Sequence, residues 1–479
     1  MRDYLHLFVN GKEHKISGSE AFQPLSTFLR WGLGATGTKI VCEEGDCGAC
    51  SVLVGKLKDG KIDYQPINSC IQLLYQADLS HIITVEGLKQ NGHLNPVQEA
   101  MVECHGTQCG FCTPGFVVAM CEYFDRSKSP CAQGIKDSVT GNLCRCTGYE
   151  PIIKAGLNVD MAGIVPLSEL YPPAEMSKIF AKERSESVLI KTEDKTVFLP
   201  ANLADAAKFK SEHSDAIIIA GGTDVCVVMN KRAYAPKVVM SFGNIEGLNE
   251  ISVSENHIKV GATATLSQLE AFVKDRVPEF FHLLWVFGSP QIRNAGTLAG
   301  NIANASPIAD TPPFLFVMDA VINLTSSKGN RQVRINDFYK GYKKFDMQAD
   351  EFISSVEIPL PAKGEMVRLY KVSRRKHLDI STNTAAFKFK LNGNKIEDIT
   401  IAYGGVAAVI LRLPKTEAFL KGKQIELDVF HQAAELAVSE ITPISDVRGS
   451  KEFRLQLAKN LLSKLFYEIK EGRIAACQQ

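Results

Sequence analysis

The chain has 479 residues, of which 45% are hydrophobic and 22% charged, and its formal net charge is +1. This length predicts about two or three domains with sizeable cores. The balanced charge gives no reason to expect nucleic acid or an anionic membrane surface as a partner. No apolar run reaches the ~18 residues of a spanning helix, and the first residues lack the apolar core of a signal peptide. We therefore expect a cytoplasmic protein.

The first 86 residues predict a small β-rich domain. A strand over residues 5–9 is followed by Asn10-Gly11, a strong hairpin signal that returns the chain towards Lys15. Residues 24–30 are expected to form a helix, and residues 51–54 a further strand.

Residues 87–165 predict a helical domain. Asn95-Pro96 and Thr113-Pro114 each place a capping residue before a proline at the first helical position. Two more helices are expected near residues 135–139 and 150–157. The segment 166–190 is polar, carries two adjacent prolines and has no clear apolar period, so we expect a linker there.

From residue 191 onward, strands and helices alternate, which predicts an α+β domain over 191–362 and a second α+β domain over 363–479. The expected strands include residues 216–220, 258–260, 387–389 and 399–402. The predicted fold class is therefore α+β.

The thirteen cysteines are unevenly distributed, because eleven of them lie before residue 150. In a reducing cytosol such clustering favours metal binding over disulfides. The first set is Cys42, Cys47, Cys50 and Cys70, and its C-x4-C-x2-C spacing is typical of a plant-type [2Fe–2S] cluster. A structural zinc site is the alternative, although zinc sites usually use two C-x2-C pairs.

A second set combines the C-x2-C pair Cys109 and Cys112 with the C-x-C pair Cys144 and Cys146. Both pairs lie near predicted helix starts, where the helix dipole favours thiolate. On spacing alone, zinc remains an open alternative for this set. Ordinary packing or surface positions are expected for the other cysteines, which are Cys104, Cys121, Cys131, Cys226 and Cys477.

These cysteine motifs resemble the iron–sulfur half of the molybdenum hydroxylases, the xanthine dehydrogenase and aldehyde oxidase family. The resemblance continues in family order through residues 219–224, 291–301, 305–310, 373–380 and 403–405. It implies a plant-type ferredoxin-like β-grasp over 1–86, a helical bundle with a second cluster over 87–165, an FAD-binding domain over 191–362 and a C-terminal flavoprotein domain over 363–479. It also implies that both cysteine sets hold [2Fe–2S] clusters.

The buried strand that runs into Gly221-Gly222 suits an FAD diphosphate, because glycines let backbone N–H groups reach phosphate oxygens. The predicted segment comprises Ile218, Ile219, Ala220, Gly221, Gly222, Thr223, Asp224 and Val225. Further FAD candidates are Thr297, Gly300 and Asn301 for phosphate or ribitol, Asp310 for sugar hydroxyls and Phe287 for a ring. For Phe287, core packing is an equal alternative. Arg293 and Arg374 either steer a nicotinamide dinucleotide or lie solvated at the surface.

The resemblance implies an electron-transfer subunit without catalytic residues of its own. A molybdenum cofactor in a separate large subunit would oxidise a purine such as xanthine. Electrons would then pass to the second cysteine set, the first set, FAD and finally NAD+, and Gln108 would face the partner's pterin. An NAD-linked xanthine dehydrogenase within a hetero-oligomer is expected. An aldehyde or N-heterocycle (for example nicotinate) dehydrogenase and a non-enzymatic iron–sulfur redox sensor remain alternatives.

Overall fold

The computed structural model describes residues 1–127, 129–232 and 234–473. Cys477 lies outside the described residues. The chain forms two compact units: the first contains Met1–Glu246 and Ser289–Gly296, and the second contains Gly247–Gly288 and the chain from Thr297 onward. In the described part of the chain, no helix combines the length and the apolar character needed to cross a membrane.

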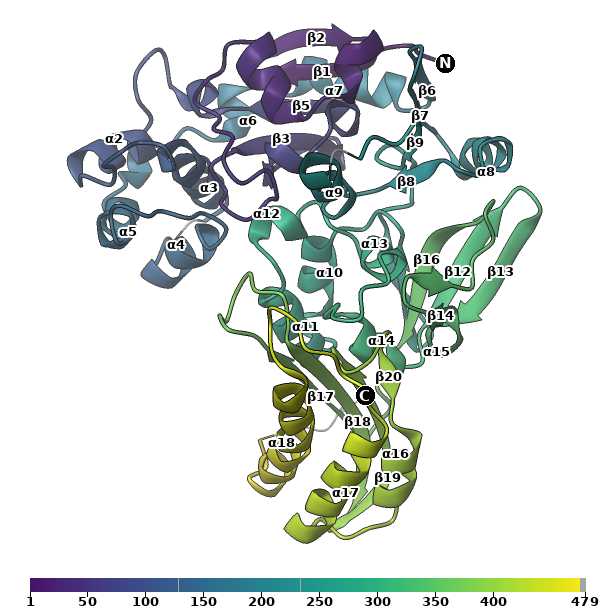
Figure 1. Ribbon diagram of the computed structural model, residues 1–479. Helices are drawn as coiled ribbons and strands as arrows, with labels where there is room; N and C mark the ends of the chain where they lie inside the picture. The colour runs from purple at the N-terminus through teal and green to yellow at the C-terminus, as the bar shows by residue number, and fades with distance from the viewer. Residues whose placement is uncertain (128, 233, 474–479) are drawn as a thin grey trace. The chain divides into compact units, whose positions relative to one another are not determined.

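The N-terminal sheet of the first unit confirms the predicted β-grasp (Figure 1). Its order is β2-β1-β5-β3-β4, and the central pair β1 and β5 is parallel. Asn10 and Gly11 both have positive φ, as a tight hairpin turn requires. The strands are β1 (Leu5–Val9), β2 (Lys12–Ile16), β3 (Ser51–Lys58), β4 (Lys61–Asn68) and β5 (Ser80–Ile83).

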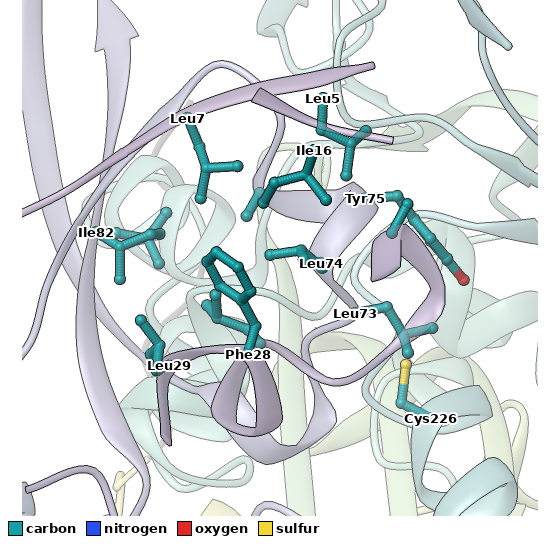
Figure 2. Packing of buried hydrophobic residues seen from close by; sticks show 14 of the residues in the cluster. Leu5, Leu7, Ile16, Phe28, Leu29, Leu73, Leu74, Tyr75, Ile82 and Cys226 are labelled. Atoms are coloured by element: carbon teal, nitrogen blue, oxygen red, sulfur yellow. The ribbon is translucent and has the colours of Figure 1, made fainter. Parts of the chain in front are cut away.

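One side of this sheet is covered by the predicted helix, α1 (Leu25–Thr27), which continues as a π-helix over Phe28–Gly32. Phe28 and Leu29 are buried there, and Figure 2 shows them beside Leu7 and Ile82 of the sheet. The same apolar cluster includes Cys226 from the flavin-like part of the chain. The β-grasp and that part therefore share one core.

Four helices follow the β-grasp: α2 (Pro96–Glu103), α3 (Thr113–Arg126), α4 (Ala132–Ser138) and α5 (Glu150–Leu157). Asn95 caps α2 as predicted, accepting a hydrogen bond from the Gln98 amide at 2.9 Å. The prediction that Thr113 caps α3 was wrong. Cys112 occupies the cap and Thr113 is the first helical residue, with its hydroxyl bonded to the Thr107 hydroxyl.

The segment 166–190, expected to be a linker, contains α6 (Leu167–Leu170) and α7 (Ala174–Glu183). Phe180 is 1% exposed and packs edge-on against Phe8 of β1, with ring centroids 5.9 Å apart. Only Met176 and Phe180 of α7 are buried. Two apolar positions four residues apart are too few to reveal a helical period in the sequence.

A second sheet of the first unit has the order β6-β7-β9-β8. Its elements are β6 (Val188–Lys191), β7 (Thr196–Leu199), α8 (Leu203–Glu212), β8 (Ile217–Ile219), α9 (Val225–Arg232) and β9 (Val238–Ser241). The short helix α12 (Pro290–Arg293) also belongs to this unit.

The second unit contains two larger sheets with the predicted α+β character. The first has the order β10-β11-β16-β12-β13. Its strands are β10 (Ile251–Ser254), β11 (His257–Gly261), β12 (Val321–Ser326), β13 (Gly329–Arg334) and β16 (Phe352–Pro359). The helices are α10 (Leu266–Val273), α11 (Pro278–Trp285), α13 (Leu298–Ala303), α14 (Pro312–Val317) and α15 (Ile335–Phe338), and β14 (Tyr339–Gly341) pairs with β15 (Lys344–Phe345).

The C-terminal sheet is antiparallel with the order β17-β18-β19-β20. Its strands are β17 (Glu365–Val372), β18 (Asn383–Asn392), β19 (Lys395–Gly404) and β20 (Leu411–Arg412). Buried residues of this sheet pack with those of the helices α16 (Pro414–Leu420), α17 (Leu427–Ser439) and α18 (Lys451–Lys470) in one core.

Candidate redox cofactor sites

The structure brings the four thiols of the first cysteine set together. The Cys42 thiol hydrogen-bonds the thiols of Cys47 and Cys70, and Cys50 also bonds Cys70. Cys47, Cys50 and Cys70 are buried. The fold therefore brings Cys70, at the end of β4, to the loop that carries the other three thiols.

These contacts split the pKa values of the set. The hydrogen bond with Cys47 lowers the pKa of Cys42 far below its ordinary value, while contacts with Cys42 raise the pKa of Cys47 and Cys70. With their raised pKa values, Cys47 and Cys70 keep their protons as thiols. A metal ligand must be a thiolate, so binding a cluster here would release those protons.

Two glycines of the first loop have no room for a side chain. Gly48 has φ +67°, and a Cβ atom there would lie 2.2 Å from the Gly141 carbonyl oxygen. Gly45 has φ +77°, and its Cβ would lie 2.5 Å from Ile71 Cδ1. Both positions therefore require glycine, as expected for a loop that wraps closely around a group.

The second cysteine set also comes together. The Sγ atoms of Cys109 and Cys146 are 3.6 Å apart, and Cys112 hydrogen-bonds Cys144. Burial raises the pKa of Cys112 to about 12. Burial also opposes ionisation of Cys144, but the hydroxyl and amide of Thr147 both lie against its sulfur and lower its pKa overall.

Sulfur contacts in the second set therefore form two pairs, whereas in the first set they form one chain that runs from Cys47 through Cys42 and Cys70 to Cys50. A two-iron cluster takes four thiolate ligands, two on each iron, and each set brings four thiols together, which fits the donor set of [2Fe–2S]. In the described ranges, no group of three or more histidine, cysteine, aspartate or glutamate side chains is placed to hold a single metal ion.

The two cysteine loops contact each other directly within the first unit. The Leu143 amide, adjacent to Cys144, donates to the Cys47 carbonyl at 2.9 Å. Asn142 Nδ2 donates to the Gly48 carbonyl at 3.1 Å, and buried Gln291 donates to Asn142 Oδ1 at 3.1 Å. Sequence reasoning missed Asn142 and Leu143 and placed Gln291 only in a flavin-like segment, because contacts between distant loops leave no spacing signal.

The predicted diphosphate segment lies where β8 ends and α9 begins. Ile218 and Ile219 belong to the strand, and Val225 is the first helical residue. Gly222 has φ +73°. Such a strand–loop–helix junction presents backbone N–H groups and the positive end of a helix to a phosphate.

Gly221 has a second structural reason to be glycine. A Cβ atom there would lie 1.9 Å from the Ala295 carbonyl oxygen, so any side chain would collide with backbone of the same unit. The adjacent Ala220 carbonyl accepts a hydrogen bond from Gln76 at 3.0 Å.

The remaining predicted FAD residues belong to the second unit. Thr297 caps α13, and its Oγ1 accepts from the Gly300 amide at 3.0 Å, which leaves its hydroxyl proton available to donate. Asn301 Oδ1 accepts from the Thr311 hydroxyl at 2.6 Å. Phe287 is half-buried just after α11.

The Asp310 carboxylate already has two partners within the protein, which the sequence did not indicate. It is buried, forms an ion pair with Lys371 and accepts a hydrogen bond from the Ser381 hydroxyl at 2.5 Å. A sugar hydroxyl would have to use the remaining lone pairs of this carboxylate.

A basic cavity of about 380 Å³ lies in the second unit. Its lining includes the cationic residues Arg368, Lys371, Arg374, Arg375 and Lys376, together with the acid Glu279. Arg374 is exposed and donates to the Val447 carbonyl at 3.0 Å. Arg293, in α12, is only 7% exposed. The alternative that Arg293 lies solvated at the surface was therefore wrong.

The surroundings of the second cysteine set are exposed and partly apolar. Gln108 and Cys109 are both exposed. Phe111 is 48% exposed and Leu143 is 52% exposed.

Among the cysteines outside both sets, Cys121 and Cys226 are buried, Cys104 is half-buried and Cys131 is exposed.

Comparison with known families matches three domains in the order of the folded regions. Residues 84–157 match a [2Fe-2S] binding domain, residues 191–361 the FAD binding domain in molybdopterin dehydrogenase, and residues 368–469 the CO dehydrogenase flavoprotein C-terminal domain. A solved chain of quinoline 2-oxidoreductase from Pseudomonas putida 86 is 32% identical with a TM-score of 0.54, and the alignment covers 57% of this chain and 96% of that one. The chain belongs to the molybdenum hydroxylase family.

This molybdenum hydroxylase chain is an iron–sulfur and FAD-binding electron-transfer component of an oxidoreductase. Xanthine dehydrogenase 1 of Arabidopsis thaliana is 31% identical over 96% of the chain and 39% of the relative. Aldehyde oxidase 1 of Bos taurus is 28% identical over 98% of the chain and 39% of the relative. The chain thus spans about 39% of the length of these curated relatives.

Proposed function

We propose that this chain passes electrons from a separate large molybdenum-cofactor subunit to NAD+, as the electron-transfer subunit of a xanthine dehydrogenase. The observation that carries the proposal is the contact between the two four-cysteine sets through the hydrogen bond from Leu143 to the Cys47 carbonyl, 2.9 Å long. Two redox groups joined through one hydrogen bond suit a relay of electrons better than two independent structural sites.

We assign different residues to the binding of each cofactor. The two cysteine sets would each hold a [2Fe–2S] cluster, and residues 218–225 with Thr297, Gly300, Asn301 and Asp310 would hold FAD. When bound, the clusters exchange single electrons and FAD exchanges electron pairs with a nicotinamide. The chain itself supplies thiolates, backbone donors and close-packed glycine loops, and it needs no acid–base residue.

Cofactor content of the purified chain tests this proposal. We expect about four irons and four labile sulfides per chain, as two [2Fe–2S] clusters contain, together with about one FAD. Iron–sulfur absorbance without flavin would favour a redox sensor instead. Stoichiometric zinc in either cysteine set would contradict the cluster at that site.

The surface around the second cysteine set is the proposed entry point for electrons. Cys109 and Cys146 are exposed, in contrast to the three buried thiols of the first set. The neighbouring side chains of Phe111 and Leu143 offer exposed apolar area. Because these apolar side chains are exposed next to cysteines of the second set, we assign this surface to the interface with the large molybdenum subunit.

The basic cavity supports an anionic acceptor such as NAD+. Arginine side chains recognise phosphate oxygens through strong, charge-assisted hydrogen bonds. We expect an Arg374→Ala change to raise KM for NADH about tenfold, the equivalent of ~1.4 kcal/mol of binding, with little change in kcat. Steady-state NADH–ferricyanide kinetics measure both constants.

An Arg334→Ala variant is the matched control, because Arg334 is an exposed arginine of the same unit that pairs with Asp319 instead. Its KM should stay at the wild-type value. An unchanged KM in Arg374→Ala would place the nicotinamide dinucleotide elsewhere.

A further inference from the structure

Asn230, on α9, bonds two parts of the first cysteine set at once. Its Nδ2 donates to the Cys70 carbonyl at 2.9 Å and to the Glu43 carbonyl at 3.0 Å. Glu43 directly follows Cys42 and has φ 54°. A side-chain amide nitrogen has two hydrogens, so both donors of Asn230 are used.

The other end of the helix that carries Asn230 contacts the same segment, since the Cys226 thiol lies 3.9 Å from Gln76 Oε1. Gln76, six residues after Cys70, also donates to the Ala220 carbonyl of the predicted diphosphate segment at 3.0 Å. The chain between Cys70 and Gln76 contributes Leu73 and Leu74 to the apolar core. Figure 2 shows the Cys226 thiol of α9 directed at Leu73. The chain from Cys70 to Gln76 is therefore held against the loop and α9 at both ends.

We propose that Asn230 is a positioning residue that fixes the Cys42 and Cys70 side of the first cluster and raises its reduction potential. The inference rests on the proposed function, which places a cluster at this set. The positive ends of two N–H dipoles point at carbonyl groups of the ligand backbone. They stabilise the added negative charge of a reduced cluster, as nearby hydrogen-bond donors do in iron–sulfur sites.

Substitution by leucine tests the proposal, because Asn230→Leu keeps a side chain of similar length and removes both donors. In the cofactor-replete complex, a redox titration followed by electron paramagnetic resonance reports each cluster separately. We expect about a tenfold fall in the ratio of reduced to oxidised first cluster at a fixed potential, which is about 59 mV for a one-electron couple. The second cluster should titrate as in the wild type.

Lys231→Arg is the matched control, since Lys231 is the next residue of α9 and this change keeps the positive charge of its exposed pair with Glu44, at 3.7 Å. This variant should titrate like the wild type. If Asn230→Leu fails to assemble the first cluster, the same titration is made on Asn230→Ser. The serine side chain is too short to reach the carbonyl of Glu43 or of Cys70, so this variant also removes both hydrogen bonds.

The outcomes separate this inference from the proposed function. A wild-type chain without iron–sulfur signals would overturn both. Two intact clusters with an unshifted first cluster in the Asn230 variants would overturn only the role of Asn230, as would an equal shift in Lys231→Arg.

Discussion

A Cys47→Ala variant should lose the first cluster and keep the second, with iron falling from about four to about two atoms per chain. Cys47 is buried and bonds the Cys42 thiol, so no other side chain can take its place without moving the loop. Substrate-to-NAD+ turnover of the complex should fall by more than about a hundredfold, since even residues that only support metal ligands cost 10–100-fold when changed.

Cys112→Ala should give the complementary result, loss of the second cluster with retention of the first. Both variants should retain NADH–ferricyanide activity, because that reaction needs only the flavin site. Iron analysis, electron paramagnetic resonance and turnover measurements check these expectations together. Cys131→Ala is the control, as Cys131 is an exposed cysteine outside both sets.

Full iron content in either ligand variant would refute the assigned ligand set. Loss of both clusters in Cys47→Ala would point instead to a common folding requirement. The contact from Leu143 to the Cys47 carbonyl makes that outcome worth testing, but it uses the backbone, which the substitution leaves intact.

Local sequence signals predicted the elements that depend on local chemistry. The Asn10-Gly11 turn and the Asn95 cap act over a few residues, and the structure has both as predicted. The cap of α3 was misplaced by one residue, because a proline at the second helical position fits a helix start as well as one at the first.

Features that depend on distant contacts were not readable in the sequence. Helix α7 is held by the packing of Phe180 on Phe8, and these residues are far apart in the chain. Likewise, Arg293 looked like a surface residue because its burial comes from the fold around α12. The need for glycine at position 221 was predicted for a ligand, whereas the structure adds a collision with the Ala295 carbonyl.

The predicted cofactor residues show the same contrast between local signals and distant contacts. Motifs indicated which side chains are candidates for binding a cofactor, but not the residues that hold those side chains in place. Asp310 was predicted from its motif, and its buried partner Lys371 was not. Asn230 lies 160 positions from Cys70, so only the folded chain brings its amide to that carbonyl.

Given NADH, the isolated chain should reduce ferricyanide, and given xanthine it should do nothing until the large molybdenum subunit is added. The two half-reactions are expected to separate because the cysteine sets and FAD segments of this chain account for its redox residues, while substrate oxidation belongs to the partner in the proposed function. Turnover of the reconstituted complex with xanthine, aldehydes and N-heterocycles then distinguishes among the alternative substrates.

A Gln108→Ala variant examines the path between the subunits. Gln108 is exposed beside the exposed Cys109, where we place the partner. The variant should keep NADH–ferricyanide activity and slow xanthine–NAD+ turnover about tenfold, as the loss of a supporting contact at a metal site does. Gln133→Ala on α4, another exposed glutamine of the helical region, should leave both rates unchanged. Xanthine oxidation by the isolated chain would overturn this division of labour, and so would an FAD-replete chain that fails to react with NADH.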